Sequence, residues 1–131
     1  MERKNVASGT VWEPIVGYSR AVRVGPHVVV AGTTASDSQG NVIAPGDPHG
    51  QAIACLRRIE KALAGAGASL QDVVRTRMFV TSIEYWREVA RAHAEVFRDI
   101  RPAATMVQVS RLLEPEMLVE IEADAIVAGA A

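Results

Sequence analysis

Aromatic residues and an excess of basic charge are both missing from this chain of 131 residues. Only 5% of the residues are Phe, Trp or Tyr, so side chains on which nucleobases could stack are few. The 14 lysines and arginines do not outnumber the 15 aspartates and glutamates, which leaves no basic surplus to neutralise phosphates. These shortages argue against a nucleic-acid-binding protein.

Cysteine and long apolar runs are also scarce. The only cysteine, Cys55, cannot form an internal disulfide, and its isolation favours a reducing compartment. The charged segment 1–6 leads into no apolar stretch typical of a secretory signal. No run approaches the roughly 20 apolar residues of a membrane-spanning helix. We therefore expect a cytoplasmic protein with no membrane partner.

Hydrophobic residues make up 49% of the sequence, enough for one domain over residues 1–131 with its own core. The patterns predict three strands, a helix, a strand, a helix and two strands. The strands are expected at 5–9, 18–24, 27–33 and 73–80, with the last two inside 101–127. The structure of 10–17 stays open, and 34–47 is a polar loop. Two helices covering one face of a mixed six-stranded sheet place the fold in the α/β (α+β) class.

The first helix has clear start and stop signals. Asp47 and Pro48 have the residue types of an N-cap and a first helical position, and the glycines in 65–67 end the helix. Its apolar stripe consists of Ala52, Leu56, Ile59 and Leu63. Cys55 lies beside that stripe, which favours a small core residue over a nucleophile.

The second helix is expected to open at Thr81 and Glu84, which have capping-box spacing. His93 lies on its apolar side, together with Trp86, Val89 and Phe97. A hydrogen-bonded core or interface histidine is favoured over a catalytic base. The other two histidines, His27 and His49, have no ligand-like spacing with His93, so the sequence predicts no metal site.

The last predicted strand carries three acids on one face, Glu120, Glu122 and Asp124, because side chains alternate along a strand. We infer that the sheet face away from the helices is mixed. It is expected to carry Arg75, Arg77, Phe79, Ala104, Met106, Gln108, Glu120, Glu122 and Ile126. Such a face is too apolar for solvent and too charged for a monomer core, so a symmetric oligomer is expected to cover it.

Several short segments, in this order along the chain, resemble the YjgF/RidA family. They are Gly17-Tyr18, Val30-Ala31-Gly32, the strand and helix within 73–97, Arg101-Pro102-Ala103 and Val119-Glu120-Ile121-Glu122-Ala123. The similarity spans nearly the whole chain. It implies a chorismate-mutase-like fold that forms a homotrimer, small-molecule ligands in clefts between subunits, and no metal or organic cofactor.

The resemblance also implies a chemistry. Members with the full pattern are enamine/imine deaminases that hydrolyse 2-aminoacrylate-type intermediates to 2-keto acids and ammonia. Their first glutamate of the Val-Glu-Ile-Glu run, here Glu120, helps to position or activate water. The arginine that binds the substrate carboxylate is replaced by Ala104. Loss of that charged contact costs roughly 2 to 5 kcal/mol of binding.

The missing guanidinium leaves two alternatives open. Arg20, Arg77 or Arg101 of the same or a neighbouring subunit reaches the cleft, or the ligand lacks that carboxylate. A pocket that has Ala104, with Met106 where many members have cysteine, is expected to be less cationic than usual.

The resemblance implies further site residues, and some of them have a second, structural interpretation. Tyr18 matches a tyrosine that lines the cleft, although a tyrosine with a structural hydrogen bond is the other interpretation. Gly32 indicates the close approach of a backbone or ligand, or else a β-bulge. Thr33 departs from the family's usual glutamine, and backbone N–H groups near Thr105 are expected to bind an oxyanion or carboxylate.

A few roles stay open at this stage. Glu120 as a site residue is weighed against an interface salt bridge. Trp12 and Glu13 have no clear family counterpart and either close the cleft or pack against the sheet.

Two functions are therefore considered. The first is a cofactor-free hydrolase of imine, enamine or related C–N metabolites, altered or weakened by the alanine at 104. The second is a non-catalytic metabolite-binding trimer. Some relatives are labelled ribonucleases or translation inhibitors, an activity that the charge balance does not favour here.

We predict that the chain forms a stable oligomer, because copies of the half-covered sheet would cover one another. Sedimentation analysis at micromolar concentration measures its mass. A stable monomer under these conditions would remove the clefts between subunits and the ligand site expected there.

Overall fold

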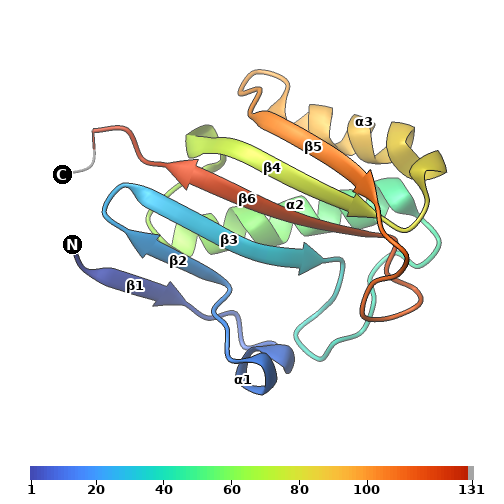
Figure 1. The fold of residues 1–131 in the computed structure, drawn as a ribbon, viewed down its shortest axis with the longest axis horizontal. Coiled ribbons are helices and arrows are strands. Elements are labelled where there is room, and N and C mark those ends of the chain that lie inside the picture. Colours follow the sequence, from blue (N-terminus) through green and yellow to red (C-terminus); the bar gives the residue numbers. More distant parts are fainter. Residues whose placement is uncertain (130–131) are drawn as a thin grey trace.

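The computed structural model describes residues 1–129 of the chain. Six strands form one mixed sheet in the order β1-β2-β3-β6-β4-β5, and helices α2 and α3 lie against one face of it (Figure 1). The strands are β1 Arg3–Val6, β2 Ala21–Val24, β3 His27–Thr34, β4 Val73–Val80, β5 Ala103–Gln108 and β6 Val119–Ile126, and the helices are α1 Trp12–Val16, α2 Pro48–Gly65 and α3 Trp86–Phe97. The predicted mixed sheet with two covering helices is confirmed. None of these helices is long and apolar enough to cross a membrane.

The N-terminal strands differ from the prediction at their bounds. β1 covers Arg3–Val6 instead of 5–9, and β2 begins at Ala21 instead of residue 18. The connection between them contains the short helix α1, which ends at Gly17 with a left-handed φ of 83°. Glycine adopts this conformation without strain, so the chain turns there and Tyr18 lies before the strand.

The turn between β2 and β3 and the start of α2 both follow from local sequence. Gly25 and Pro26 connect β2 and β3, which pair antiparallel. The Asp47 carboxylate caps α2 by accepting a hydrogen bond from the backbone N–H of Gly50 at 2.9 Å. Pro48 is the first residue of the helix, where a backbone N–H would have no helical partner.

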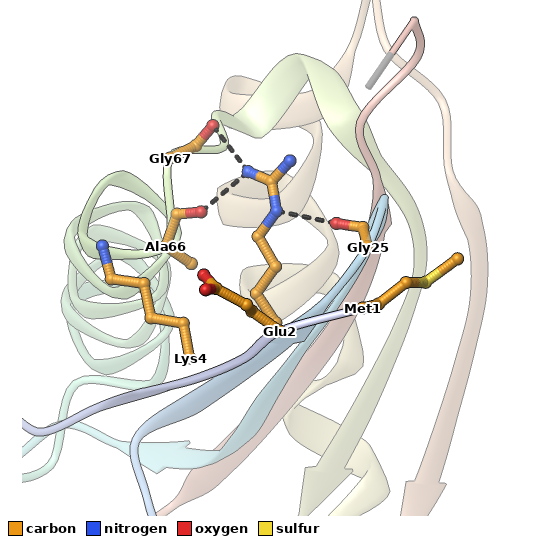
Figure 2. A pocket seen from close by; sticks show the side chains of 7 residues that line it. Met1, Glu2, Lys4, Gly25, Ala66 and Gly67 are labelled. Carbon is orange, nitrogen blue, oxygen red and sulfur yellow. Dashed lines mark hydrogen bonds between the residues drawn. The ribbon is translucent and has the colours of Figure 1, made fainter. Parts of the chain in front are cut away.

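The C-terminal end of α2 is tied to the β2–β3 hairpin by Arg23. Its Nη1 donates to the carbonyl oxygens of Ala66 (2.9 Å) and Gly67 (3.2 Å), and its Nε donates to that of Gly25 (2.9 Å), as the dashed lines in Figure 2 show. The last carbonyls of a helix lack helical partners and carry partial negative charge. A guanidinium there stabilises both the helix end and the hairpin.

The start of α3 corrects the predicted capping box. The Oγ of Ser82, in place of Thr81, accepts a hydrogen bond from the backbone N–H of Glu84 at 3.3 Å, and a 3₁₀ turn over Ile83–Tyr85 leads into the helix. Trp86 was expected in the apolar stripe, but it is 46% exposed. The buried face of α3 consists of Val89, Ala92 and Phe97.

The core lies between the helices and alternate residues of the central strands. The predicted inward face of β6 is confirmed, with Val119, Ile121, Ala123 and Ala125 buried. On β4 an irregularity between Val73 and Arg75 shifts the alternation. Strict alternation from Arg75 predicts Val73 on the open face and Val74 in the core. The structure reverses these two residues, since Val73 is buried and Val74 is 43% exposed.

β5 turns its side chains opposite to the prediction. It pairs parallel with β4, with Ala104 opposite Thr76 and Met106 opposite Met78. Since residues opposite each other in a ladder share a face, these β5 residues and Gln108 lie on the helix side, and Met106 packs against the core. The open face of β5 carries Ala103, Thr105 and Val107. Alternation gives two sets of residues but does not say which set faces the helices.

Cys55 is a core residue, as predicted. It is fully buried in α2, and burial raises the pKa of its thiol to about 12. A thiol that does not ionise near neutral pH is a poor nucleophile.

Glu13 anchors α1 to the segment before it. Its carboxylate accepts hydrogen bonds from the backbone N–H and hydroxyl of Ser8 (3.1 and 2.7 Å) and of Thr10 (3.0 and 2.6 Å). Burial alone would raise the pKa of Glu13, but these hydrogen bonds outweigh it and lower the pKa from 4.5 to about 2. The ionised form is thus favoured in the folded state.

We expect Glu13→Gln to destabilise the protein by on the order of 1 to 3 kcal/mol at neutral pH, because an amide cannot accept all four hydrogen bonds. The folded-state pKa lies below the unfolded one, so this contribution is complete above about pH 5 and is lost as the pH falls towards about 2. Urea unfolding at pH 7 and pH 3 measures the difference. Glu60→Gln, in an exposed helical pair, is the control, and an equal loss in both variants would contradict the expectation.

Candidate functional site

A pocket of about 280 Å³ lies where α1, the end of β3, the start of β6 and α2 approach one another. Its lining combines apolar side chains with two arginines and one glutamate. The lining residues are Trp12, Ile15, Val16, Tyr18, Arg20, Gly32, Thr34, Arg58, Leu113, Met117 and Glu120. Pockets of this kind, apolar with a few polar groups, are typical of small-molecule sites.

The glutamate of this pocket lies over a glycine of the neighbouring strand. Glu120 on β6 pairs with Thr34 on β3, and the ladder between these strands is irregular between Val30 and Thr33. A Cβ on Gly32 would lie 2.5 Å from Oε2 of Glu120, so a side chain at this position would require the carboxylate to move from its present place. The interpretation of Gly32 as part of a β-bulge is confirmed, since it lies in the irregular stretch, and its close neighbour is a side chain in place of the expected backbone or ligand.

The surroundings of Glu120 favour its neutral form. Burial raises the pKa of Glu120, the positive charge of Arg20 opposes that rise, and the negative charge of Glu122 adds to it. Within residues 1–129 the Glu120 carboxylate has no hydrogen-bond partner. A partly buried carboxyl with a raised pKa and free oxygens can exchange a proton with a bound molecule.

Two arginines flank this glutamate. Arg20 is only 3% exposed, and its Nη2 donates to the carbonyl oxygen of Gly32, while its Cζ lies 5.5 Å from the centre of the Tyr18 ring. Nη1 of Arg58 donates to the carbonyl oxygen of Thr34 (2.7 Å) and to Oγ of Ser36 (3.2 Å). Burial lowers the pKa of Arg58, and the charge of Arg20 lowers it further.

One wall of the pocket depends on a buried amide that the sequence reasoning missed. Gln51 is fully buried; its Oε1 accepts from the backbone N–H of Leu118 (2.8 Å), and its Nε2 donates to the carbonyl oxygens of Glu116 (2.9 Å) and Ala44 (3.3 Å). These bonds fix the loop that carries Met117 into the pocket. The available signal was a polar residue one turn before Cys55, next to an apolar stripe.

The structure brings three of the predicted site residues together and separates the others. Tyr18, Gly32 and Glu120 line one pocket. The side chain of Thr33 faces the helices instead, is fully buried and donates to a backbone carbonyl, while Thr34 lines the pocket in its place. The three residues from β5, which are Ala104, Thr105 and Met106, lie across β4 from β6 in the same chain.

Of the three arginines considered as replacements, Arg20 lines the pocket. Arg77 forms salt bridges on the open sheet face with Glu122 (3.3 Å) and Asp124 (3.4 Å). Arg101 lies exposed before β5, beside another hollow, and its Nε donates to the carbonyl oxygen of Arg98.

The remaining open residues have structural contacts. Trp12 lines the pocket, and Glu13 caps the preceding segment as described. Nε2 of His93 is 2.8 Å from Oγ1 of Thr76, which confirms the predicted hydrogen-bonded histidine, and burial lowers the pKa of His93.

A second, wider hollow of about 510 Å³ lies at the C-terminal end of α2 (Figure 2). Met1, Glu2 and Lys4 line it together with the hairpin. Its arginine, Arg23, already binds three backbone carbonyls. The pocket around Glu120 is therefore the better candidate for chemistry.

Known proteins are similar to this chain in sequence and in fold. The sequence model of the family described as Endoribonuclease L-PSP matches residues 10–127. An uncharacterised protein of Streptomyces coelicolor is 35% identical over 123 residues, which cover 93% of this chain and 90% of that protein. A RutC family protein of Pyrococcus abyssi is 34% identical over 111 residues, 85% of this chain and 87% of that protein.

Solved structures are also similar to this chain in fold. Rv2704 of Mycobacterium tuberculosis, described as a member of the YjgF/YER057c/UK114 family, is 55% identical with a TM-score of 0.88, covering 96% of this chain and 100% of that one. E. coli TdcF, solved with bound serine, is 25% identical with a TM-score of 0.77, covering 85% of this chain and 88% of that one.

We expect Glu120→Gln to raise the melting temperature by a few degrees at about pH 7.5, because it removes the cost of burying an ionised carboxylate. The folded-state pKa of Glu120 lies above its unfolded value. The cost is therefore absent below the unfolded pKa and grows as the pH rises through the folded one, so the gain should vanish near about pH 4. Thermal unfolding followed by circular dichroism at both pH values measures this.

Glu122→Gln is the matched control, since Glu122 lies on the same face of β6 but forms a salt bridge with Arg77. No gain is expected there. A fall in melting temperature for Glu120→Gln at pH 7.5 would show that an ionised Glu120 stabilises the fold.

Proposed function

This chain belongs to the Endoribonuclease L-PSP (YjgF/RidA) family, and from that premise we propose that it binds a small imine, enamine or related metabolite around Glu120 and hydrolyses its C–N bond. The observation that carries the proposal is the Glu120 carboxylate. It lies over Gly32, partly buried and without a hydrogen-bond partner in the described residues, in a pocket with largely apolar walls. The enamine/imine deaminase activity of the family members that this chain resembles supports the reaction class.

In the proposed reaction Glu120 transfers protons in two directions. Ionised Glu120 removes a proton from a water molecule whose oxygen forms a bond to the imine carbon. The protonated Glu120 returns this proton to the nitrogen, which gives a carbinolamine. Glu120 then transfers the hydroxyl proton of the carbinolamine to its nitrogen, the C–N bond breaks, and a carbonyl compound and ammonia leave. The raised pKa of Glu120 supports this role, because a general acid/base works best with a pKa near the operating pH. No metal or organic cofactor takes part in this scheme.

The pocket is proposed to be completed in a homotrimer, where the edge strand β5 of a neighbouring subunit brings the backbone around Thr105, between Ala104 and Met106, to the cleft. Backbone N–H groups near Thr105 would then face the ligand. The exposure of apolar side chains at the pocket rim supports a covering partner: Ile15 is 79% exposed and Leu113 is 63% exposed.

A non-catalytic metabolite-binding trimer is the second candidate. The observation that favours it is Ala104, because a methyl group cannot bind the substrate carboxylate that an arginine binds in complete family members. RNA cleavage, which the family description names, has less support because a net charge of −1 provides no phosphate-binding surface.

Imines generated in situ by amino-acid oxidases test the proposal, with release of the keto acid as the measurement. We expect little or no turnover of 2-iminobutanoate and 2-iminopropanoate by the wild type, and a rise of about tenfold or more in Ala104→Arg. Imines with larger apolar side chains, made from leucine and phenylalanine, fill the pocket better and should be hydrolysed. Glu120→Ala should lower kcat/KM for them by on the order of 100-fold.

Glu122→Ala serves as the control on the same face of β6 and should keep activity within about threefold of the wild type. Wild-type turnover of the two small imines at the level of a complete family member would contradict the importance of Ala104. If no imine is hydrolysed faster than in buffer, the non-catalytic function stands and the hydrolytic one does not.

A further inference from the structure

We propose that Arg20 and Arg58 form the anion-binding end of this pocket, and that its ligand is an organic carboxylate with an apolar tail. This inference rests on the proposed function for the location of the site. It adds which residues bind the charged end of the ligand and what the rest of the ligand is like.

Both arginines lie against the end of β3 that lines the pocket. Arg20 donates to the carbonyl oxygen of Gly32, and Arg58 donates to that of Thr34, two residues later. Gly32 is also the residue over which the Glu120 carboxylate lies. The two guanidinium groups and the proposed acid/base therefore adjoin the same short segment of backbone.

Neither arginine forms a salt bridge with another residue in the part of the chain that the structure describes. Among residues 1–129 the salt bridges involve other cations, namely His49, Arg57, Arg77 and Arg91. Nε of Arg20 is buried without a hydrogen-bond partner in this part of the chain. A buried guanidinium without an ionic partner is costly, and a bound anion would offset that cost.

The nearby carboxylates leave this positive charge uncompensated. Glu120 offers one negative charge against two guanidinium groups, and its own ionisation is disfavoured by burial. The charge of Glu13 is the smallest of the influences on the pKa of Arg58, and the carboxylate of Glu13 already accepts hydrogen bonds from Ser8 and Thr10. A planar carboxylate matches guanidinium geometry and can accept hydrogen bonds from both arginines.

The rest of the pocket specifies the tail. Five apolar side chains from α1 and from the loop before β6 form its walls: Trp12, Ile15, Val16, Leu113 and Met117. These walls offer no partner for a second charged or strongly polar group. A volume of about 280 Å³ accommodates a branched or aromatic group besides the carboxylate.

Calorimetric titration of the oligomer with phenylacetate and with phenylacetamide tests the proposal. The two probes have the same ring and differ in charge. We expect phenylacetate to bind about tenfold or more tightly, and Arg58→Gln and Arg20→Gln each to raise its Kd by about 10- to 100-fold. Arg77→Gln, which removes a guanidinium of the open sheet face, should change the Kd by less than about twofold.

Fluorescence in a Trp86→Phe background locates the bound probe. Trp86 is exposed on α3, outside the pocket, so the remaining signal comes from Trp12 in the pocket wall. Phenylacetate should change this signal with the calorimetric Kd. Arg20→Lys, which keeps the charge but loses the planar group, should bind phenylacetate better than Arg20→Gln and worse than the wild type.

Equal affinity for the two probes, binding of neither, or undiminished phenylacetate binding in Arg58→Gln would overturn the proposal. Because Arg58 is partly exposed and Arg20 is not, Arg58→Gln decides the outcome if Arg20→Gln does not fold. Imine turnover that depends on Glu120 but not on either arginine would overturn this inference alone. Binding of phenylacetate through both arginines without turnover of any imine would overturn only the hydrolytic function.

Discussion

The contact between the Glu120 carboxylate and the backbone at Gly32 is the constraint on which the pocket depends. It requires a glycine in β3, an irregular ladder between β3 and β6, and a glutamate at the one register position opposite Thr34. Arg20 binds the Gly32 carbonyl and so fixes the same segment from the other side. A side chain at position 32 would push the carboxylate away, which makes the absence of a Cβ as important to this site as any functional group.

The two faces of the sheet around this contact differ in polarity. The face under α2 and α3 is closed by apolar side chains, whereas the open face carries Arg77 between Glu122 and Asp124. These acids have a cationic partner within their own sheet, so the aligned carboxylates of β6 do not simply repel one another. Glu120, at the end of the same row, lacks such a salt bridge in the described residues. This difference is the reason that we propose a structural role for Glu122 and a chemical role for Glu120.

Local sequence signals predicted much of the fold. The alternation in β6, the Asp47 cap of α2 and the turn at Gly25 depend on neighbours in the chain, and the structure has all three. It was harder to predict which side of the sheet a side chain faces wherever this depends on the pairing register of the strands. The irregularity in β4 reverses the faces of Val73 and Val74, and the register of β5 against β4 turns the side chain of Ala104 towards the helices. In β3, the irregularity between Val30 and Thr33 inserts one extra residue, which reverses the faces of all the side chains that follow. Thr34 therefore lies in the pocket instead of Thr33.

The parts of the site that the sequence could not supply are those that cost stability. Arg58 directly precedes Ile59 of the apolar stripe and was not among the arginines considered from the sequence. Arg20 was one of three candidates, but nothing in the sequence says that Arg20 and Arg58 converge on the end of β3. A chain selected for stability alone would not leave a buried guanidinium nitrogen and a partly buried carboxylate without hydrogen-bond partners in the same pocket. Gln51 shows that this fold can satisfy a buried polar group completely where it needs one. Groups left unsatisfied in the same neighbourhood therefore argue for a ligand that satisfies them, and the apolar walls around them argue that the ligand is small and only partly polar.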